Sequence, residues 1–196
     1  RVWLWLEDGA EATINLNLSS RNDADETLTL VSLTAIVGRN STLRLHEIQG
    51  LNARAYSVCE KTMIVESDGS ADWVTVEAGS NRSSSDLILD LAGDSASAKV
   101  NGVFFGSDEQ RLTMHTRQEH HGKNTFSSLL YKGAVTDRAR GVWTGMIYVD
   151  PMALGADGYQ KNDNLMLSPD ARVFARPGLE IVTDDVKCSH GTTVTE

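Results

Sequence analysis

The sequence ATINLNLS at residues 12–19 decides the fold class, because apolar and polar side chains alternate along it without a break. The apolar side chains fall at every second position from Ala12 to Leu18, which is the period of a β-strand with one buried face. The same alternation returns at residues 31–37 and 87–91. Helix formers never accumulate, and β-branched residues, Ser, Thr and Gly are frequent throughout. We therefore expect an all-β fold.

The turns between these runs recur at nearly constant spacing. Short acidic or glycine-containing turns precede new strands near residues 12, 42 and 72, and again near 140 and 172, a step of about 30 residues that indicates a solenoid. With strands in place of helices, the expected solenoid is a β-helix of about six coils. A β-sandwich or jelly roll is the alternative, but such folds usually contain Asn-Gly hairpin turns, and here Asn101-Gly102 lies inside an apolar run.

Composition excludes several classes of function. The chain has 196 residues and a formal net charge of -9, and its longest basic cluster is Arg138-Ala-Arg140, which argues against nucleic acid as a partner. Because no run of about 18 apolar residues occurs, we expect no membrane span. The two cysteines lie far apart and form no disulfide framework, which favours a reducing compartment such as the cytoplasm.

Cys188 and His190 form a candidate metal site. On an extended strand, side chains two residues apart emerge on the same face, with Cα atoms about 6.5–7 Å apart. Thiolate and imidazole suit zinc, iron or an iron–sulfur cluster better than magnesium or calcium. Asp184 has the same face parity and is a candidate outer ligand, with a solvated carboxylate as the alternative. On spacing alone, a small buried thiol beside an ordinary loop histidine is the simpler interpretation.

A second group of candidates is His115, His120 and His121, which lie close together in the sequence and could bind a transition metal. Alternation places His115 on the polar face of its strand, and the run from His120 to Gly122 resembles an exposed turn, which favours histidines without a metal. Cys59 is expected to be a buried structural thiol on a strand. A redox pair of Cys59 with Cys188 is the weaker alternative.

The segment LEIVTDDVKCSHGTTV at residues 179–194 resembles the signature of SufD-type subunits in the SufB/SufD family, the scaffold of the SUF iron–sulfur cluster assembly machinery. The resemblance extends backwards through four further segments and is clearest over the last half of the chain. These segments are Tyr131–Gly133, Ala139–Val142, Gly145–Val149 and Gln160–Ser168.

The resemblance implies a single right-handed parallel β-helix core domain over residues 1–196, flanked in family members by N- and C-terminal helical regions that these residues do not include. It implies a non-enzymatic scaffold that pairs through the end of the β-helix with a SufB-type subunit or with a second copy of itself. A SufC-type ATPase would bind the C-terminal helices. The location would be the cytoplasm, or a plastid in a eukaryote.

The resemblance also assigns candidate site residues. The run from Lys187 to His190 matches the family's Lys-Cys-Ser-His motif, so His190 is the first candidate and Cys188 the second for holding the nascent iron–sulfur cluster at the subunit interface. The cluster would be transient and shared with the partner subunit, with none held tightly by this chain alone.

Two other function classes stay open at this stage. A β-helix enzyme acting on acidic polysaccharide needs basic side chains or paired carboxylates along a lateral groove. No such stripe is evident in the sequence, and the net charge of -9 opposes an acidic polymer. A stand-alone metal-binding protein would instead use His115, His120 and His121.

Overall fold

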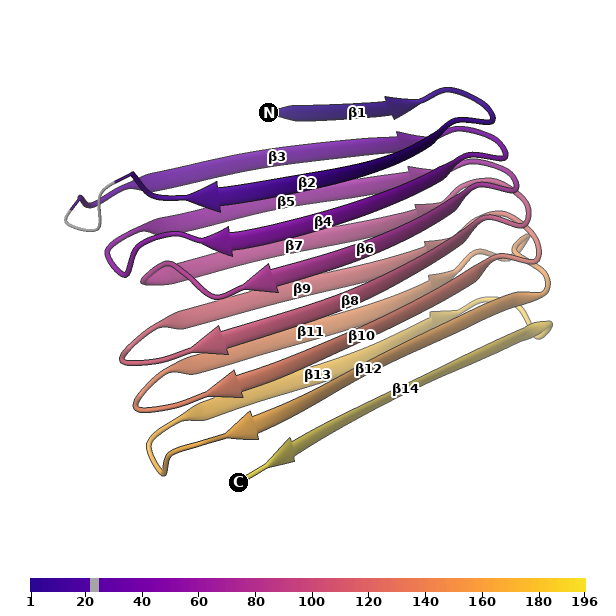
Figure 1. The fold of residues 1–196 in the computed structure, drawn as a ribbon. Coiled ribbons are helices and arrows are strands. Elements are labelled where there is room, and N and C mark those ends of the chain that lie inside the picture. The colour runs from indigo at the N-terminus through magenta and orange to yellow at the C-terminus, as the bar shows by residue number, and fades with distance from the viewer. Residues whose placement is uncertain (22–24) are drawn as a thin grey trace.

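Two parallel β-sheets of seven strands each face one another in a computed structural model that describes residues 1–21 and 25–196 (Figure 1). The odd-numbered strands form sheet A and the even-numbered strands form sheet B. The strands are β1 Val2–Leu6, β2 Glu11–Ser19, β3 Leu28–Val37, β4 Thr42–Gly50, β5 Tyr56–Val65, β6 Ser70–Glu77, β7 Arg82–Leu91, β8 Ser97–Gly106, β9 Arg111–His120, β10 Phe126–Val135, β11 Arg140–Val149, β12 Ala156–Met166, β13 Arg172–Ile181 and β14 Val186–Thr195.

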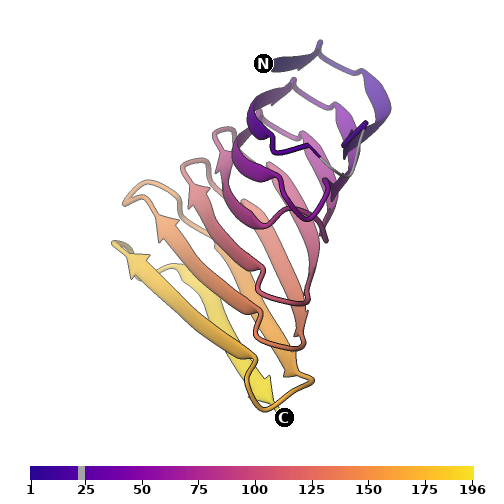
Figure 2. The ribbon, with the colours of Figure 1, turned by 90° about the vertical axis from the view of Figure 1, so that its left-hand side faces the viewer.

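Each pair of consecutive strands makes one coil, and each strand pairs in parallel with the strand two places later in the chain. The expected parallel β-helix is therefore confirmed. The termini lie at opposite ends of the stack (Figures 1 and 2). The coils number seven instead of about six, because β1 pairs with β3 and so adds a coil that the spacing of the turns does not reveal.

The interior is built from rows, which are residues in register on successive strands of one sheet. In sheet B one inward row begins with Ala12, Leu43 and Ala71 and ends at Gly158 and Cys188. Because side chains alternate between faces, the apolar positions predicted from residues 12–18 and 87–91 do face the interior. Burial of each large aliphatic or phenyl side chain, such as Leu89 or Phe104, stabilises the fold by roughly 1.5–3 kcal/mol.

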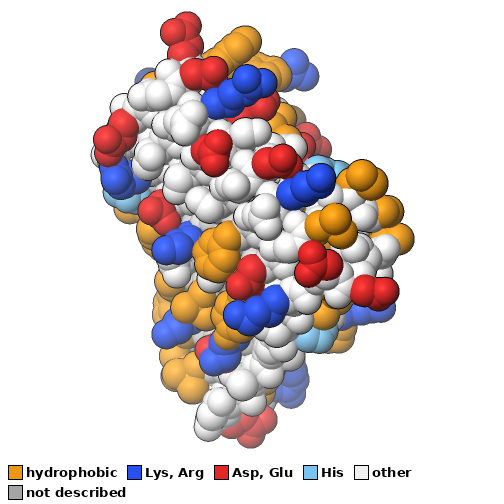
Figure 3. Space-filling model, turned by 90° about the vertical axis from the view of Figure 1, so that its right-hand side faces the viewer, with side chains coloured by type: hydrophobic (Ala, Val, Ile, Leu, Met, Phe, Trp, Pro, Cys, Tyr) orange, Lys and Arg blue, Asp and Glu red, His pale blue; other side chains and the backbone are white. Residues whose placement is uncertain are grey.

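The corners after the strands of sheet A are stacked by main-chain hydrogen bonds. At six successive corners one residue has a left-handed backbone, and its N–H donates to a carbonyl of the following coil. These residues are Gly9, Asn40, Asp68, Ser95, Asn124 and Gly155. Glycine, asparagine and aspartate tolerate this conformation best, which explains the polar and glycine-containing turns of the sequence. Acidic and basic side chains are interspersed over this face of the molecule (Figure 3).

Among the described residues there is no helix able to span a bilayer. Sheet A ends with β13, which pairs only with β11, and sheet B ends with β14, which pairs only with β12. The inward faces of these two strands are therefore covered on one side only within the described chain. This last coil carries the candidate cysteine and histidine.

Candidate functional site

Cys188 and His190 lie on β14 in register with Gly158 and Gln160 of β12. Gly158 and Gln160 are buried and face inward, so the two candidate residues also face the interior of the coil. Val186, at the same parity, packs with Cys188 against the buried cluster that contains Ile147. The thiol and the imidazole therefore emerge side by side on one face of β14, as the spacing predicts.

Gly158 creates the space that Cys188 occupies. A Cβ atom at Gly158 would lie 3.2 Å from the Cys188 Sγ, which is closer than nearly all Cβ contacts. Burial raises the pKa of the Cys188 thiol, and the nearby Asp157 carboxylate adds to the rise, although a backbone hydrogen bond from Gly158 opposes it. The thiol is therefore held protonated at neutral pH until a metal or another cation favours the thiolate.

His120 lies beneath this thiol, with its Nε2 also 3.2 Å from the same Cβ position. Its Nδ1 is 2.7 Å from the Thr125 Oγ1 and its Nε2 is 2.8 Å from the Ser127 Oγ. Gln118 donates to Ser127, and Thr125 donates to the Gly122 carbonyl. Both hydroxyls then have consistent roles if His120 donates from Nδ1 to Thr125 and accepts at Nε2 from Ser127. Because Nε2 already accepts from Ser127, His120 is not free to bind a metal through this atom. It lines the inner side of the site instead.

The floor beneath His190 is also polar. Gln160 is fully buried, and its Nε2 donates to the Gly178 carbonyl at 2.9 Å. Its Oε1 has no hydrogen-bond partner among the described residues. Further along β12, the inward-facing Asn162 and Asn164 hydrogen-bond to each other. His190 itself is exposed, because no further strand lies on β14 within the described chain.

Within the described residues, the last coil brings together two candidate metal donors, the Cys188 thiol and the His190 imidazole. No group of three or more His, Cys, Asp or Glu side chains in residues 1–21 and 25–196 is arranged to hold a metal ion. Asp184 lies in the bend before β14, outside the strand, so its predicted shared parity with Cys188 and His190 does not continue into a common strand face. A four-coordinate site would need two further ligands from another source.

Comparison with known families identifies the chain. The family model described as SUF system FeS cluster assembly, SufBD core domain, matches residues 1–196. The chain belongs to this family. The resemblance read from residues 179–194 is thereby confirmed.

Individual relatives agree with this family assignment. The chain is 30% identical over 194 residues to the iron-sulfur cluster assembly protein SufD of Escherichia coli, covering 99% of this chain and 46% of that protein. It is 23% identical over 197 residues to Protein ABCI7, chloroplastic, of Arabidopsis thaliana, covering 100% of this chain and 42% of that protein. The chain therefore spans less than half the length of these two relatives.

The three clustered histidines of this SufBD core do not converge. His115 lies on the outer face of sheet A, where its Nδ1 hydrogen-bonds to the Thr144 hydroxyl. His121 lies at an exposed corner, with its Nε2 3.5 Å from a Glu119 carboxylate oxygen. His120 is fully buried, so its prediction as part of an exposed turn is wrong. The strand continues to His120 because it pairs with Val149 at the end of β11.

Cys59 is buried on β5, as predicted, with 1% of its surface exposed. Its Sγ lies 3.5 Å from the Ser57 Oγ. Both cysteines are free thiols, and Cys59 lies in sheet A four coils before Cys188, which lies in sheet B. The structure therefore gives no redox pair between them.

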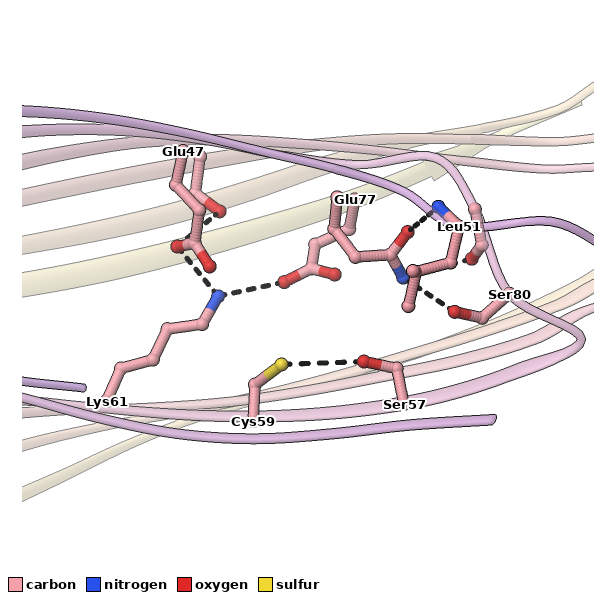
Figure 4. A network of polar contacts seen from close by, with 10 residues as sticks. Glu47, Leu51, Ser57, Cys59, Lys61, Glu77 and Ser80 are labelled. Carbon is pink, nitrogen blue, oxygen red and sulfur yellow. Dashed lines mark hydrogen bonds and ion pairs between the residues drawn. The ribbon is translucent and has the colours of Figure 1, made fainter. Parts of the chain in front are cut away.

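A buried ion triad lies next to Cys59 (Figure 4). The Lys61 Nζ is 2.9 Å from a Glu47 carboxylate oxygen and 3.0 Å from a Glu77 oxygen, and all three side chains are almost completely buried. Burial alone lowers the pKa of Lys61, but attraction to Glu77 and Glu47 outweighs burial and raises it. Lys61 is therefore charged inside the core.

Sequence reasoning missed the triad, although its signal was present. Glu47 continues the inward parity of Leu43 and Leu45, and Lys61 stands between Cys59 and Met63 at inward parity. Charged residues at core parity are expected only where they pair with one another. Which residues pair depends on the register between sheets, and the sequence alone does not specify that register.

Proposed function

We propose that this chain is a non-enzymatic scaffold subunit for iron–sulfur cluster assembly, and that its last coil forms half of the site where a nascent cluster is built. The observation that carries the proposal is the placement of Cys188 and His190 in neighbouring inward positions of β14, the outermost described strand of sheet B. Membership of the SufBD core family supports the same function.

The last coil also has the character of a protein interface. Leu179, Ile181 and Val194 have inward parity, yet they are 37%, 39% and 45% exposed. Apolar side chains and strand edges presented together favour association with another chain. We propose a SufB-type subunit as the partner, with a second copy of this chain as the partner in its absence.

The cluster is the cargo of this interface and not a resident cofactor. Cys188 and His190 supply two donors suited to iron, and the partner subunit supplies the remaining thiolate ligands. Sharing the ligands between two chains allows the cluster to leave when the interface opens. A SufC-type ATPase drives this opening in the proposed complex, which works in the cytoplasm or in a plastid.

The test uses one substitution in the interface and one matched substitution on the lateral face. Val194→Asp introduces a charge into the proposed interface, whereas Val103→Asp introduces it on the outer face of β8, where the valine is 46% exposed. Full-length proteins are co-expressed anaerobically with a SufB-type subunit and a SufC-type ATPase. Val194→Asp should abolish co-purification and cluster absorbance, and Val103→Asp should preserve both. A complex and a cluster retained with Val194→Asp would contradict the proposal.

The stand-alone metal-binding alternative is not favoured, because its three histidines point to three different environments.

A further inference from the structure

Four consecutive strands of sheet A begin with arginine. Arg82, Arg111, Arg140 and Arg172 are in register on β7, β9, β11 and β13, and all four are exposed. The strands of sheet A begin on the side of the stack that faces the viewer in Figure 2. The expectation that the chain has no basic stripe is therefore wrong. About 30 residues separate successive arginines, so the stripe exists only once the coils stack.

We call these four arginines the arginine ladder. Its first three members have no anionic partner among the described residues. Among the described residues, no hydrogen bond or ion pair engages the guanidinium groups of Arg82, Arg111 or Arg140, whereas Arg172 donates to the carbonyls of Pro169 and Ala171. A groove of about 260 Å³ runs along the ladder. It is lined by Asn81, Arg82, Glu109, Arg111, Arg138 and Arg140. Glu109, the one acid in this lining, is paired with Arg138.

Such an arrangement is electrostatically unfavourable in the isolated chain. Like charges directly opposite each other on neighbouring strands destabilise a sheet. Anions that lie on the ladder relieve this repulsion, and arginine is the side chain best suited to carboxylate and phosphate groups because its planar fork donates two parallel hydrogen bonds. The stripe is therefore a candidate anion-binding surface.

The surroundings of the ladder favour a ligand with a single row of anions. The outward row beside the ladder carries no charge and consists of Val58, Ser84, Thr113, Val142 and Phe174. Beside the ladder, the row after it consists of Asp86, His115, Thr144 and Arg176, so Asp86 is its one acid there. On the other side, the corner carries Asp108, Asp137 and Asp170. A ligand with anions on all sides would meet the acidic corner on one side and an uncharged row on the other.

Spacing selects among anionic ligands. Neighbouring strands are about 4.8 Å apart, so three successive arginines span roughly 10 Å along the stack. Carboxylates at positions i and i+4 of an α-helix stand about 5–6 Å apart, and positions i to i+7 rise about 10.5 Å. An extended peptide repeats on one face at about 6.6 Å, which fits worse.

We propose that the ladder Arg82–Arg111–Arg140 docks an α-helix of a partner protein that carries an acidic stripe at i, i+4 and i+7 spacing, with its uncharged flank on the row that includes Thr113 and Val142. The helix lies along the axis of the stack, across the strands. This surface is separate from the C-terminal coil proposed to hold the cluster.

The probe is a synthetic helical peptide with glutamates at i, i+4, i+7 and i+11, added to the full-length protein at low ionic strength, about 50 mM. A second peptide has the same composition with the glutamates spread around the helix. The protein variants are Arg111→Gln/Arg140→Gln and the control Arg39→Gln, an exposed arginine at the opposite corner. Fluorescence anisotropy measures binding, and tripolyphosphate and polygalacturonate are added as competitors.

We expect the striped peptide to bind, and the double variant to weaken binding about tenfold while Arg39→Gln leaves it unchanged. Without bound peptide, the double variant should be at least as resistant to thermal unfolding as the wild type, because repulsion within the ladder is reduced. Absence of binding, equal binding of the two peptides or equal binding by the double variant would overturn the proposal. Displacement of the peptide by tripolyphosphate or polygalacturonate at equal or lower charge concentration would assign the ladder to that ligand instead.

Discussion

The Sγ of Cys188 and the Nε2 of His120 approach one point in the interior, each 3.2 Å from the place where a Cβ atom would stand at Gly158. The two residues lie far apart in sequence and in different sheets, and the missing side chain of Gly158 allows both to reach this point. The candidate cluster ligand and a buried imidazole therefore both border the space that a side chain at position 158 would fill.

Gly158→Ala should disturb this fit. The added methyl would press on Cys188, His120 and Ile147, and overpacking of this kind costs roughly 1–3 kcal/mol of unfolding free energy. We expect a lower free energy of unfolding and less cluster in the assembled complex. The matched control is Gly191→Ala on β14, where the nearest atom to a new Cβ is the Lys161 Cγ at 4.0 Å. Equal behaviour of the two variants in denaturant titration would contradict the assignment of Gly158.

The buried His120 should make the fold sensitive to acid. Burial lowers its pKa to about 4, from 6.5 when it is free, and His121 adds to the decrease, although Asp157 opposes it. Between these values the unfolded chain binds more protons than the folded chain, so this contribution is complete above pH 6.5 and is lost as the pH falls towards 4. The loss at this one residue amounts to about 3 kcal/mol.

The measurement is the free energy of unfolding by denaturant between pH 4 and pH 7 for the wild type and for His120→Gln. Glutamine does not titrate in this window, so the variant should show a flatter pH dependence. The same slope for both proteins would show that another group causes the acid sensitivity.

The Glu47–Lys61–Glu77 triad should respond in opposite ways to partial and complete replacement. Lys61→Met leaves two buried carboxylates without a cation and should cost about 3–5 kcal/mol of stability. Replacing all three residues by Leu, Met and Leu removes the buried charges together and should be neutral or stabilising, by about 1–4 kcal/mol. Denaturant titration of both variants decides the matter. A triple variant as unstable as the single one would mean that the triad is needed for the fold.

The fold was largely predictable because alternation depends on local sequence alone. The pattern of residues 12–18 predicts the inward face of β2 correctly, and the repeated turns predict stacked coils. Features that depend on register were not predictable. His120 looks like part of a polar turn until its pairing with Val149 is known, and Arg111 and Arg140 look unrelated until β9 and β11 lie side by side. The predicted Cys188 and His190 share a face because they share one strand, which needs no register.

The two cysteines should differ in reactivity towards a thiol reagent. Cys59 is 1% exposed, whereas Cys188 is half-buried in the last coil. One thiol per chain should therefore react in the native protein and the second only after unfolding. Because burial raises the pKa of Cys188 above its usual 9.0, its reaction rate should keep rising above pH 9. Binding of a SufB-type subunit should protect it. Two reactive thiols, or none, in the native protein would contradict the burial of these residues.

The most direct test of the central claim is the iron–sulfur absorbance of the complex after anaerobic co-expression with a SufB-type subunit and a SufC-type ATPase. The wild type is compared with His190→Ala and with His115→Ala, which removes an exposed histidine from the outer face of sheet A. We predict that His190→Ala loses most of the absorbance while the complex still assembles, and that His115→Ala keeps it. Unchanged absorbance in His190→Ala would show that the last coil does not hold the cluster.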